Sequence, residues 1–135
     1  SSALEFNVKK NIMNNLIIDA ANDKILFKII TNNESYTTDY PNSRENFDKF
    51  ILLLLNFLKE KNIKIKKINN IFINHGPGKF SGIRTSISVA KALAVFNKTN
   101  IYGFNNDQIK ENKYNKILEL YAKGELIKNL IIPKY

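Results

Sequence analysis

The chain has 135 residues, of which 44% are hydrophobic, and a formal net charge of +9 at pH 7. This length suits one domain with a packed core, and the composition is too apolar for a disordered chain. The absence of cysteine excludes disulfides and thiolate metal sites. No apolar run approaches the roughly 20 residues that cross a bilayer, so we expect a cytoplasmic globular protein without membrane contact.

The first half of the chain predicts a short meander followed by a helix. Residues 1–12 lack the apolar stretch of a signal peptide and precede the single methionine; we expect them to be an expression leader outside a domain of residues 13–135. Three strand-like segments follow, at residues 16–19, 24–30 and 35–40. Ser43 is a favourable helix cap, and an apolar helix is expected over residues 44–61.

The second half alternates strands and helices. The pattern predicts a strand at 70–74, a glycine-rich turn, a helix at 83–96 and a parallel strand at 100–103. A third helix is expected at 114–123, ended by Gly124, and an added strand at 126–132. The order βββαβαβ, with a short C-terminal helix and strand, predicts a layered α/β domain with a mixed sheet.

The turn after the fourth strand is the most informative motif. It is the run His75-Gly76-Pro77-Gly78-Lys79-Phe80-Ser81-Gly82-Ile83-Arg84. A strand, a glycine-rich turn and a helix in succession can present backbone N–H groups to an anion. The spacing fits neither a P-loop, because Ile83 and Arg84 follow Gly82, nor a dinucleotide fingerprint, because Ser81 stands where glycine is needed. From the motif alone, we favour a packing role.

The motif and the segment that follows it, TSISVAKALA, resemble the signature of the TsaB (YeaZ) family. That family is the non-catalytic subunit of the bacterial machinery that makes threonylcarbamoyladenosine in tRNA. The opening strand at 16–19, Pro41-Asn42-Ser43-Arg44 and the closing Pro133-Lys134-Tyr135 are also similar, although Asn42 replaces the usual histidine and Ser81 the usual threonine. The resemblance implies one lobe of the actin-like ATPase and ribonuclease-H-like architecture, with the family's second lobe lost.

The two long helices carry more apolar residues than one sheet face can cover. On the first, Phe47, Ile51, Leu54 and Leu58 are expected to form the core stripe, and the second has a similar stripe that begins at Ile83. The remaining apolar side chains are expected to form a partner interface made of Leu52, Leu53, Leu55, Val89, Leu93 and Phe96. The alternative is that the third helix and the C-terminal segment cover them.

The family resemblance implies the identity of that partner. It would be a TsaD-like catalytic subunit, held through these two helices, with a TsaE-like ATPase as a further partner. A homodimer through the same helices is the alternative assembly.

The sequence supports no catalytic, cofactor or metal site. The turn at 19–24 lacks the glycine and hydroxyl residues that hold nucleotide phosphates in actin-like ATPases. Asp19 stands where a ribonuclease H has its first metal-binding carboxylate, but neither Asp23 nor Asp107 is placed to supply a second. We expect Asp19 to anchor the following turn, and His75, the one histidine, to be a hydrogen-bonded structural residue.

Three functions are therefore compared. The favoured one is a non-catalytic scaffold for a TsaD-like transferase, with tRNA contacted indirectly. The second is an ATP-dependent phosphotransferase-like lobe, which the turn at 19–24 disfavours. The third is an RNA-binding module that uses the basic segment 59–67, where a patch could form from Lys61, Lys64, Lys66 and Lys67.

Overall fold

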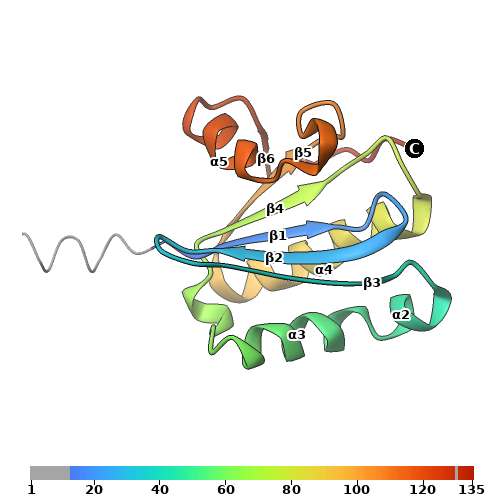
Figure 1. The fold of residues 1–135 in the computed structure, drawn as a ribbon, viewed down its shortest axis with the longest axis horizontal. Coiled ribbons are helices and arrows are strands. Elements are labelled where there is room, and N and C mark those ends of the chain that lie inside the picture. Colours follow the sequence, from blue (N-terminus) through green and yellow to red (C-terminus); the bar gives the residue numbers. More distant parts are fainter. Residues whose placement is uncertain (1–12, 130) are drawn as a thin grey trace, which may run out of the picture.

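The computed structural model describes residues 13–129 and 131–135, so the expected leader lies outside the described residues. The chain forms a six-stranded sheet in the order β3-β2-β1-β4-β5-β6, with helices on both faces (Figure 1). Its strands are β1 (Asn15–Asp19), β2 (Lys24–Ile30), β3 (Ser35–Pro41), β4 (Asn70–Asn74), β5 (Asn100–Phe104) and β6 (Ile127–Lys128).

The sheet is mixed, as predicted. Strand β1 pairs in parallel with β4, and β4 with β5, whereas β1–β2, β2–β3 and β5–β6 are antiparallel. The last strand is shorter than the predicted 126–132, because among the described residues of that range only Ile127 and Lys128 pair in register with β5. Asn129, at φ 61°, then turns the chain out of extended geometry.

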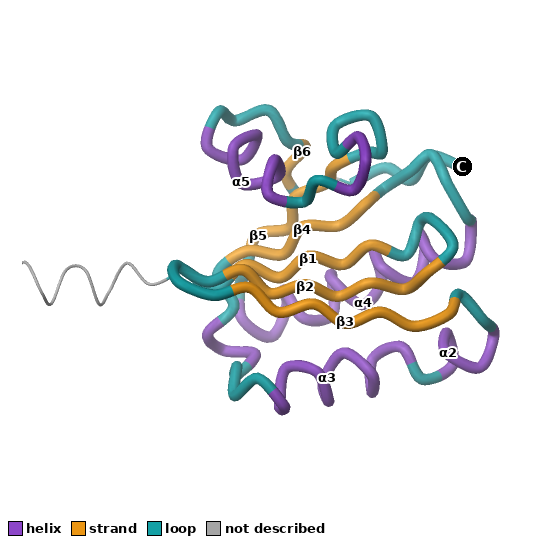
Figure 2. The backbone as a smooth tube through the Cα atoms, in the orientation of Figure 1, coloured by secondary structure: helices purple, strands orange, loops and turns teal. Residues whose placement is uncertain are grey.

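Side chains alternate between two cores, one on each face of the sheet. Leu16 and Ile18 of β1 point to the larger core, which is covered by α2 (Arg44–Asp48), α3 (Phe50–Glu60) and α4 (Phe80–Asn97). Ile17, between them, points to a smaller core under α5 (Asn115–Ala122). The period of two along each strand therefore separates the helices into two layers (Figure 2).

The first predicted helix is in fact two, separated at Lys49. The buried stripe of α3 consists of Phe50, Leu54, Phe57 and Leu58, whereas Ile51, which we expected in the core, is 46% exposed. Phe50 packs edge-on against Phe27 of the sheet, with ring centroids 5.3 Å apart, and Phe57 contacts the same ring. Burial of these larger aromatic surfaces fixes the rotation of the helix.

The remaining helices differ from the predicted ones in their bounds and in two short 3₁₀ turns. Helix α4 begins at Phe80, three residues earlier than predicted, so Gly82 is a helical residue. A short 3₁₀ turn, η1 (Ile65–Lys67), joins α3 to β4, and another, η2 (Lys110–Asn112), precedes α5. In the described ranges, no helix combines the length and the apolarity that a bilayer span requires.

Helix α5 does not cover the apolar residues of α3 and α4. Its buried residues are Ile117 and Leu120. Ile117 packs with Ile17 and Phe72 in the smaller core, on the face of the sheet opposite α3 and α4. The part of the alternative in which the third helix shields both helices is therefore wrong, whereas the C-terminal segment does reach this side, with Ile131 in the larger core and Tyr135 against Phe80 of α4. The physical reason is topological, because α5 follows β5 on the opposite face of the sheet (Figure 1).

Candidate functional site

The glycine motif lies between β4 and α4 and packs against the β1–β2 turn. A Cβ atom on Gly78 would stand 2.3 Å from the Ala21 carbonyl oxygen, and one on Gly82 would stand 1.7 Å from the Ala20 carbonyl oxygen. The Lys79 N–H donates to the Ala21 carbonyl at 2.8 Å. The glycines therefore allow two backbone segments to touch, which agrees with the packing interpretation.

The C-terminal segment lies along the same motif. Nδ1 of His75 donates to the Ile132 carbonyl at 3.1 Å, and the Lys134 N–H donates to the His75 carbonyl at 2.8 Å. The ring centroids of Tyr135 and Phe80 are 4.5 Å apart, and the Arg84 guanidinium lies 4.9 Å from the Phe80 ring centroid. Two segments that resemble the family separately in sequence are thus in contact.

His75 is a hydrogen-bonded structural residue, as predicted. It is 1% exposed, and burial lowers the pKa of its imidazole, an effect that the Ile132 hydrogen bond opposes and the nearby Lys134 charge reinforces. The neutral ring carries its proton on Nδ1, because the carbonyl of Ile132 can only accept.

A polar network surrounds the carboxyl end of β1. Asp19 is 2% exposed; its Oδ1 accepts from the Ala21 N–H and from Nδ2 of Asn74, both at 3.2 Å. Its Oδ2 accepts from the Tyr114 hydroxyl at 2.6 Å. Burial, with the Asp19 charge next, raises the pKa of Tyr114 well above its usual value. Asp19 anchors the turn that follows it, as predicted, and also holds the start of α5 to the sheet.

The network extends to residues that the sequence did not single out. Nδ2 of Asn74 donates to Oδ1 of Asn106 at 2.7 Å, and Nδ2 of Asn106 donates to the Pro77 carbonyl at 2.6 Å. Asn106, not Asp107, faces the site, since Asp107 is exposed. The available signals were Asn74, the last residue of the buried strand β4, and the pair Asn105-Asn106 just after β5, where polar side chains need partners.

The carboxylates near this end do not converge. Asp23 forms an ion pair with Lys79, at 3.3 Å, with its own side chain almost wholly exposed. Among residues 13–129 and 131–135, no group of three metal-ligating side chains comes together. The polar end of the sheet is therefore built as a structural junction between the β1–β2 turn, the glycine motif and α5.

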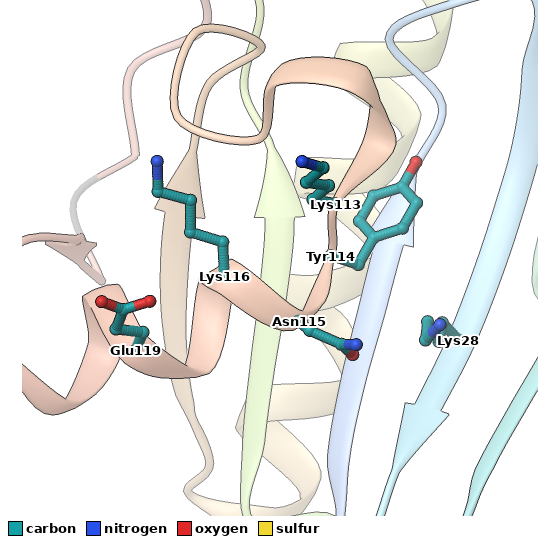
Figure 3. Close-up of a pocket in the computed structure, with 6 residues that line it drawn as sticks. All are labelled: Lys28, Lys113, Tyr114, Asn115, Lys116 and Glu119. Atoms are coloured by element: carbon teal, nitrogen blue, oxygen red, sulfur yellow. The ribbon is translucent and has the colours of Figure 1, made fainter.

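Two hollows flank Tyr114. One, of about 280 Å³, is lined by Asp19, Asn22, Asp23, Lys24, Leu26 and Tyr114. The other, of about 540 Å³, is shown in Figure 3 and is lined by Lys28, Lys113, Tyr114, Asn115, Lys116 and Glu119. The hydroxyl of Tyr114 is engaged by Asp19, and Lys113 is paired with Glu111 at 3.8 Å. Neither hollow presents an assembled set of catalytic groups.

The most exposed apolar surface lies on α3 and α4, which run in the same direction under one face of the sheet (Figure 1). Leu52 is 54% exposed, Val95 82% and Phe96 83%. We define the helix strip as these exposed or half-buried side chains: Ile51, Leu52, Leu55, Val95 and Phe96. The sequence missed Val95, although it neighbours Phe96 on the outer side of the helix.

The other predicted interface residues lie deeper. Leu93 is 6% exposed and belongs to the core between α4 and the sheet, so its assignment to the interface is wrong. The cause is the rotation of α4, which turns Leu93 toward the sheet together with Ala90 and Ile87. Leu53 and Val89 are half-buried and pack against the same core.

Comparison with known proteins places this geometry in a family. Residues 24–109, more than half of the chain, match the model of the family described as TsaD, tRNA N6-adenosine threonylcarbamoyltransferase. The chain is 29% identical, over 98 residues, to the tRNA threonylcarbamoyladenosine biosynthesis protein TsaB of Buchnera aphidicola subsp. Schizaphis graminum. That match covers 73% of this chain and 47% of the relative, so the chain spans about half the length of the curated relative it matches.

Solved structures show the same fold. YeaZ from Pseudomonas aeruginosa superposes with a TM-score of 0.67 at 16% identity, covering 83% of this chain and 50% of that one. RuvC of T. thermophilus, in complex with a Holliday junction substrate, gives a TM-score of 0.59 at 8% identity, covering 86% of this chain and 99% of that one. The fold is the ribonuclease-H-like and actin-like lobe that was predicted. The chain belongs to the TsaD family of the matching model, and it is similar to the TsaB and YeaZ proteins named above.

Proposed function

We propose that this protein is a non-catalytic scaffold in the synthesis of threonylcarbamoyladenosine in tRNA, and that the helix strip binds a TsaD-like catalytic subunit. The observation that carries this proposal is the exposure of large apolar side chains on two neighbouring helices, with no other helix of the described chain laid over them. Membership of the family suggests a role in tRNA threonylcarbamoyladenosine synthesis, and the exposed strip suggests the surface that binds the partner.

The physical chemistry of the strip supports a protein partner. Of the eight large hydrophobic residues that are clearly exposed in the described residues, four belong to the strip, namely Ile51, Leu52, Val95 and Phe96. Burying apolar surface gains about 25 cal/mol per Å², so several such side chains can anchor a stable interface. Exposed polar residues lie on the same two helices as the strip, including Asn56, Lys59 and Lys91.

The polar end of the sheet supports the non-catalytic part of the proposal. The carboxylate of Asp19 is occupied by three donors, and the backbone of the glycine motif is packed against Ala20 and Ala21. The polar groups at this end of the sheet therefore hold the β1–β2 turn, the glycine motif and the start of α5 together. A TsaE-like ATPase remains a predicted further partner, without a surface assigned to it.

Single aspartate substitutions on α3 and α4 test the proposal. We expect Leu52→Asp and Phe96→Asp each to weaken binding of a TsaD-type subunit roughly 30-fold, the loss expected when an apolar anchor worth about 2 kcal/mol is removed. The measurement is titration calorimetry of the purified proteins, with co-purification as a second readout. Unchanged affinity in both variants would contradict the assignment of the strip.

Two further variants serve as controls. Ile127→Asp adds the same charge at an apolar residue that is 44% exposed and lies on β6, away from the strip, so binding should be retained. Leu93→Asp places a charge in the core, so it should unfold the protein rather than weaken binding selectively. Circular dichroism distinguishes this loss of fold from a loss of interface.

A further inference from the structure

The end of the molecule opposite the glycine motif concentrates one kind of side chain. There α3 ends, η1 follows, and strands β1 and β4 begin (Figure 1). We define the lysine end by Lys59, Lys61, Lys64, Lys66 and Lys67. We propose that the lysine end binds the phosphate backbone of folded RNA. The choice of tRNA as that RNA rests on the proposed function.

Three of these lysines line one hollow. Lys61, Lys64 and Lys67 surround a space of about 400 Å³, with the other walls made by Asn14, Thr31, Glu34, Tyr36, Asn62 and Ile63. The ammonium group of Lys61 lies 5.1 Å from the centroid of the Tyr36 ring, an arrangement that holds the cation in place. The hollow thus combines positive charge with the Asn62 amide and the Tyr36 hydroxyl, groups that can bind phosphate and ribose oxygens.

The backbone beneath the lysines is well defined. Asn62, at φ 57°, is the second residue after α3, and its N–H donates to the Lys59 carbonyl at 3.0 Å. The next N–H, of Ile63, donates to the Leu58 carbonyl at 2.9 Å, which completes a Schellman cap. The lysines therefore project from a fixed turn and not from a loose loop.

No lysine of the lysine end forms an ion pair among the described residues, although Glu34 lines the same hollow. Five ion pairs occur in the described part of the chain, and their cations are Lys24, Lys49, Lys79, Lys113 and Lys123. None of these belongs to the lysine end. Positive charge that is not paired within the protein attracts a polyanion and gains free energy from counterion release.

A distant segment extends the same surface. The side-chain amide of Asn97 donates to the Ile65 carbonyl, and the Thr99 hydroxyl donates to the Ile68 carbonyl at 3.2 Å. These bonds hold the α4–β5 turn beside η1, so exposed Lys98 stands at the same end. The dipole of α3 favours cations in its last turn only, so it does not account for lysines in η1 or after α4.

The hollow in Figure 3 is a natural comparison, because it also has three lysines, a tyrosine and a glutamate. There, however, Lys113 is paired with Glu111, and the Tyr114 hydroxyl is turned to Asp19. Substituting its lysines Lys28, Lys113 and Lys116 removes the same charge from the opposite face of the sheet. This makes that hollow the matched control.

The test is fluorescence anisotropy of labelled tRNA with the full chain, from 50 to 200 mM NaCl. We compare wild type with the triple variants Lys61→Gln/Lys64→Gln/Lys67→Gln and Lys28→Gln/Lys113→Gln/Lys116→Gln. Loss of three phosphate contacts should shrink the ratio of affinities at the two salt concentrations by about 20- to 40-fold. This effect is expected in the first variant, while the control stays within about twofold of wild type.

Three results would overturn the inference. They are equal losses in both triple variants, absence of tRNA binding by wild type at 50 mM NaCl, and stronger lysine-end-dependent binding to phosphatidylserine vesicles than to tRNA. Thermal unfolding verifies that both variants are folded. Co-purification with a TsaD-type subunit separates the two proposals, because the first triple variant should keep that partner while losing tRNA.

Discussion

At the scale of single residues, Gly82 is the position most constrained by a neighbouring backbone. A Cβ atom there would lie 1.7 Å from the Ala20 carbonyl oxygen, and neither segment can move freely because both are tied to buried strands. We expect Gly82→Ala to lower the free energy of unfolding by about 2–3 kcal/mol, the cost of overpacking a rigid contact. Urea unfolding measures this change.

The matched control for that substitution is Ser81→Ala, one residue earlier on the same helical turn. Ser81 is exposed, so its replacement should change the free energy of unfolding by less than about 0.5 kcal/mol. Equal effects of the two substitutions would show that the close approach of the glycine to the β1–β2 turn is unimportant for stability.

His75 makes the stability of the fold depend on pH. The pKa of its imidazole is lowered in the folded state. Between the ordinary pKa and this lowered value, the unfolded chain therefore binds a proton at His75 that the folded protein does not bind. The stabilising contribution is fully present above the ordinary value of about 6.5 and is lost as pH falls through the folded pKa. We therefore expect the urea midpoint to decrease between pH 7.5 and 5.5.

A direct measurement comes from the imidazole itself. His75 is the chain's one histidine, so its Hε1 resonance can be followed without ambiguity. An NMR titration giving a pKa above 6.5 would contradict the burial argument. In the variant His75→Asn, whose amide can still donate to the Ile132 carbonyl, the decrease of the urea midpoint with acid should be smaller.

At the scale of elements, the strands were predictable because they are short runs rich in β-branched and aromatic residues, bounded by turn residues. The sequence places β2 and β4 at the observed bounds, whereas the helices were less certain. Residues 50–58 are apolar on almost every side of α3, so periodicity allows more than one rotation. Contact with Phe27 decides between them, and that ring comes from a strand distant in sequence.

Dependence on contacts distant in sequence also explains which residues at the polar end of the sheet could be predicted and which could not. Asp19 and His75 could be predicted, since single polar residues beside buried strands must be hydrogen-bonded. Tyr114 could not be predicted, because its partner Asp19 is 95 residues away and only the fold brings them together. Local patterns identify such groups, but the pairing depends on the order of strands in the sheet.

At the scale of the whole molecule, an apolar strip and a large positive charge act in opposite directions. The strip favours self-association, whereas molecules carrying a net charge of +9 repel one another. Salt shortens the screening length from about 30 Å at 10 mM to about 8 Å at 150 mM and so removes the repulsion. We expect the isolated protein to form dimers increasingly as NaCl rises, as measured by sedimentation velocity at 50 and 500 mM.

Variants on the strip identify the surface that such dimers use. Phe96→Asp should stay monomeric at both salt concentrations, because it places a charge on the exposed apolar surface, whereas Ile127→Asp should behave as wild type. Dimers that weaken with salt would instead indicate an electrostatic contact elsewhere on the molecule. A TsaD-type subunit added at equal concentration should dissociate the homodimer, since the homodimer and the complex with that subunit need the same apolar side chains.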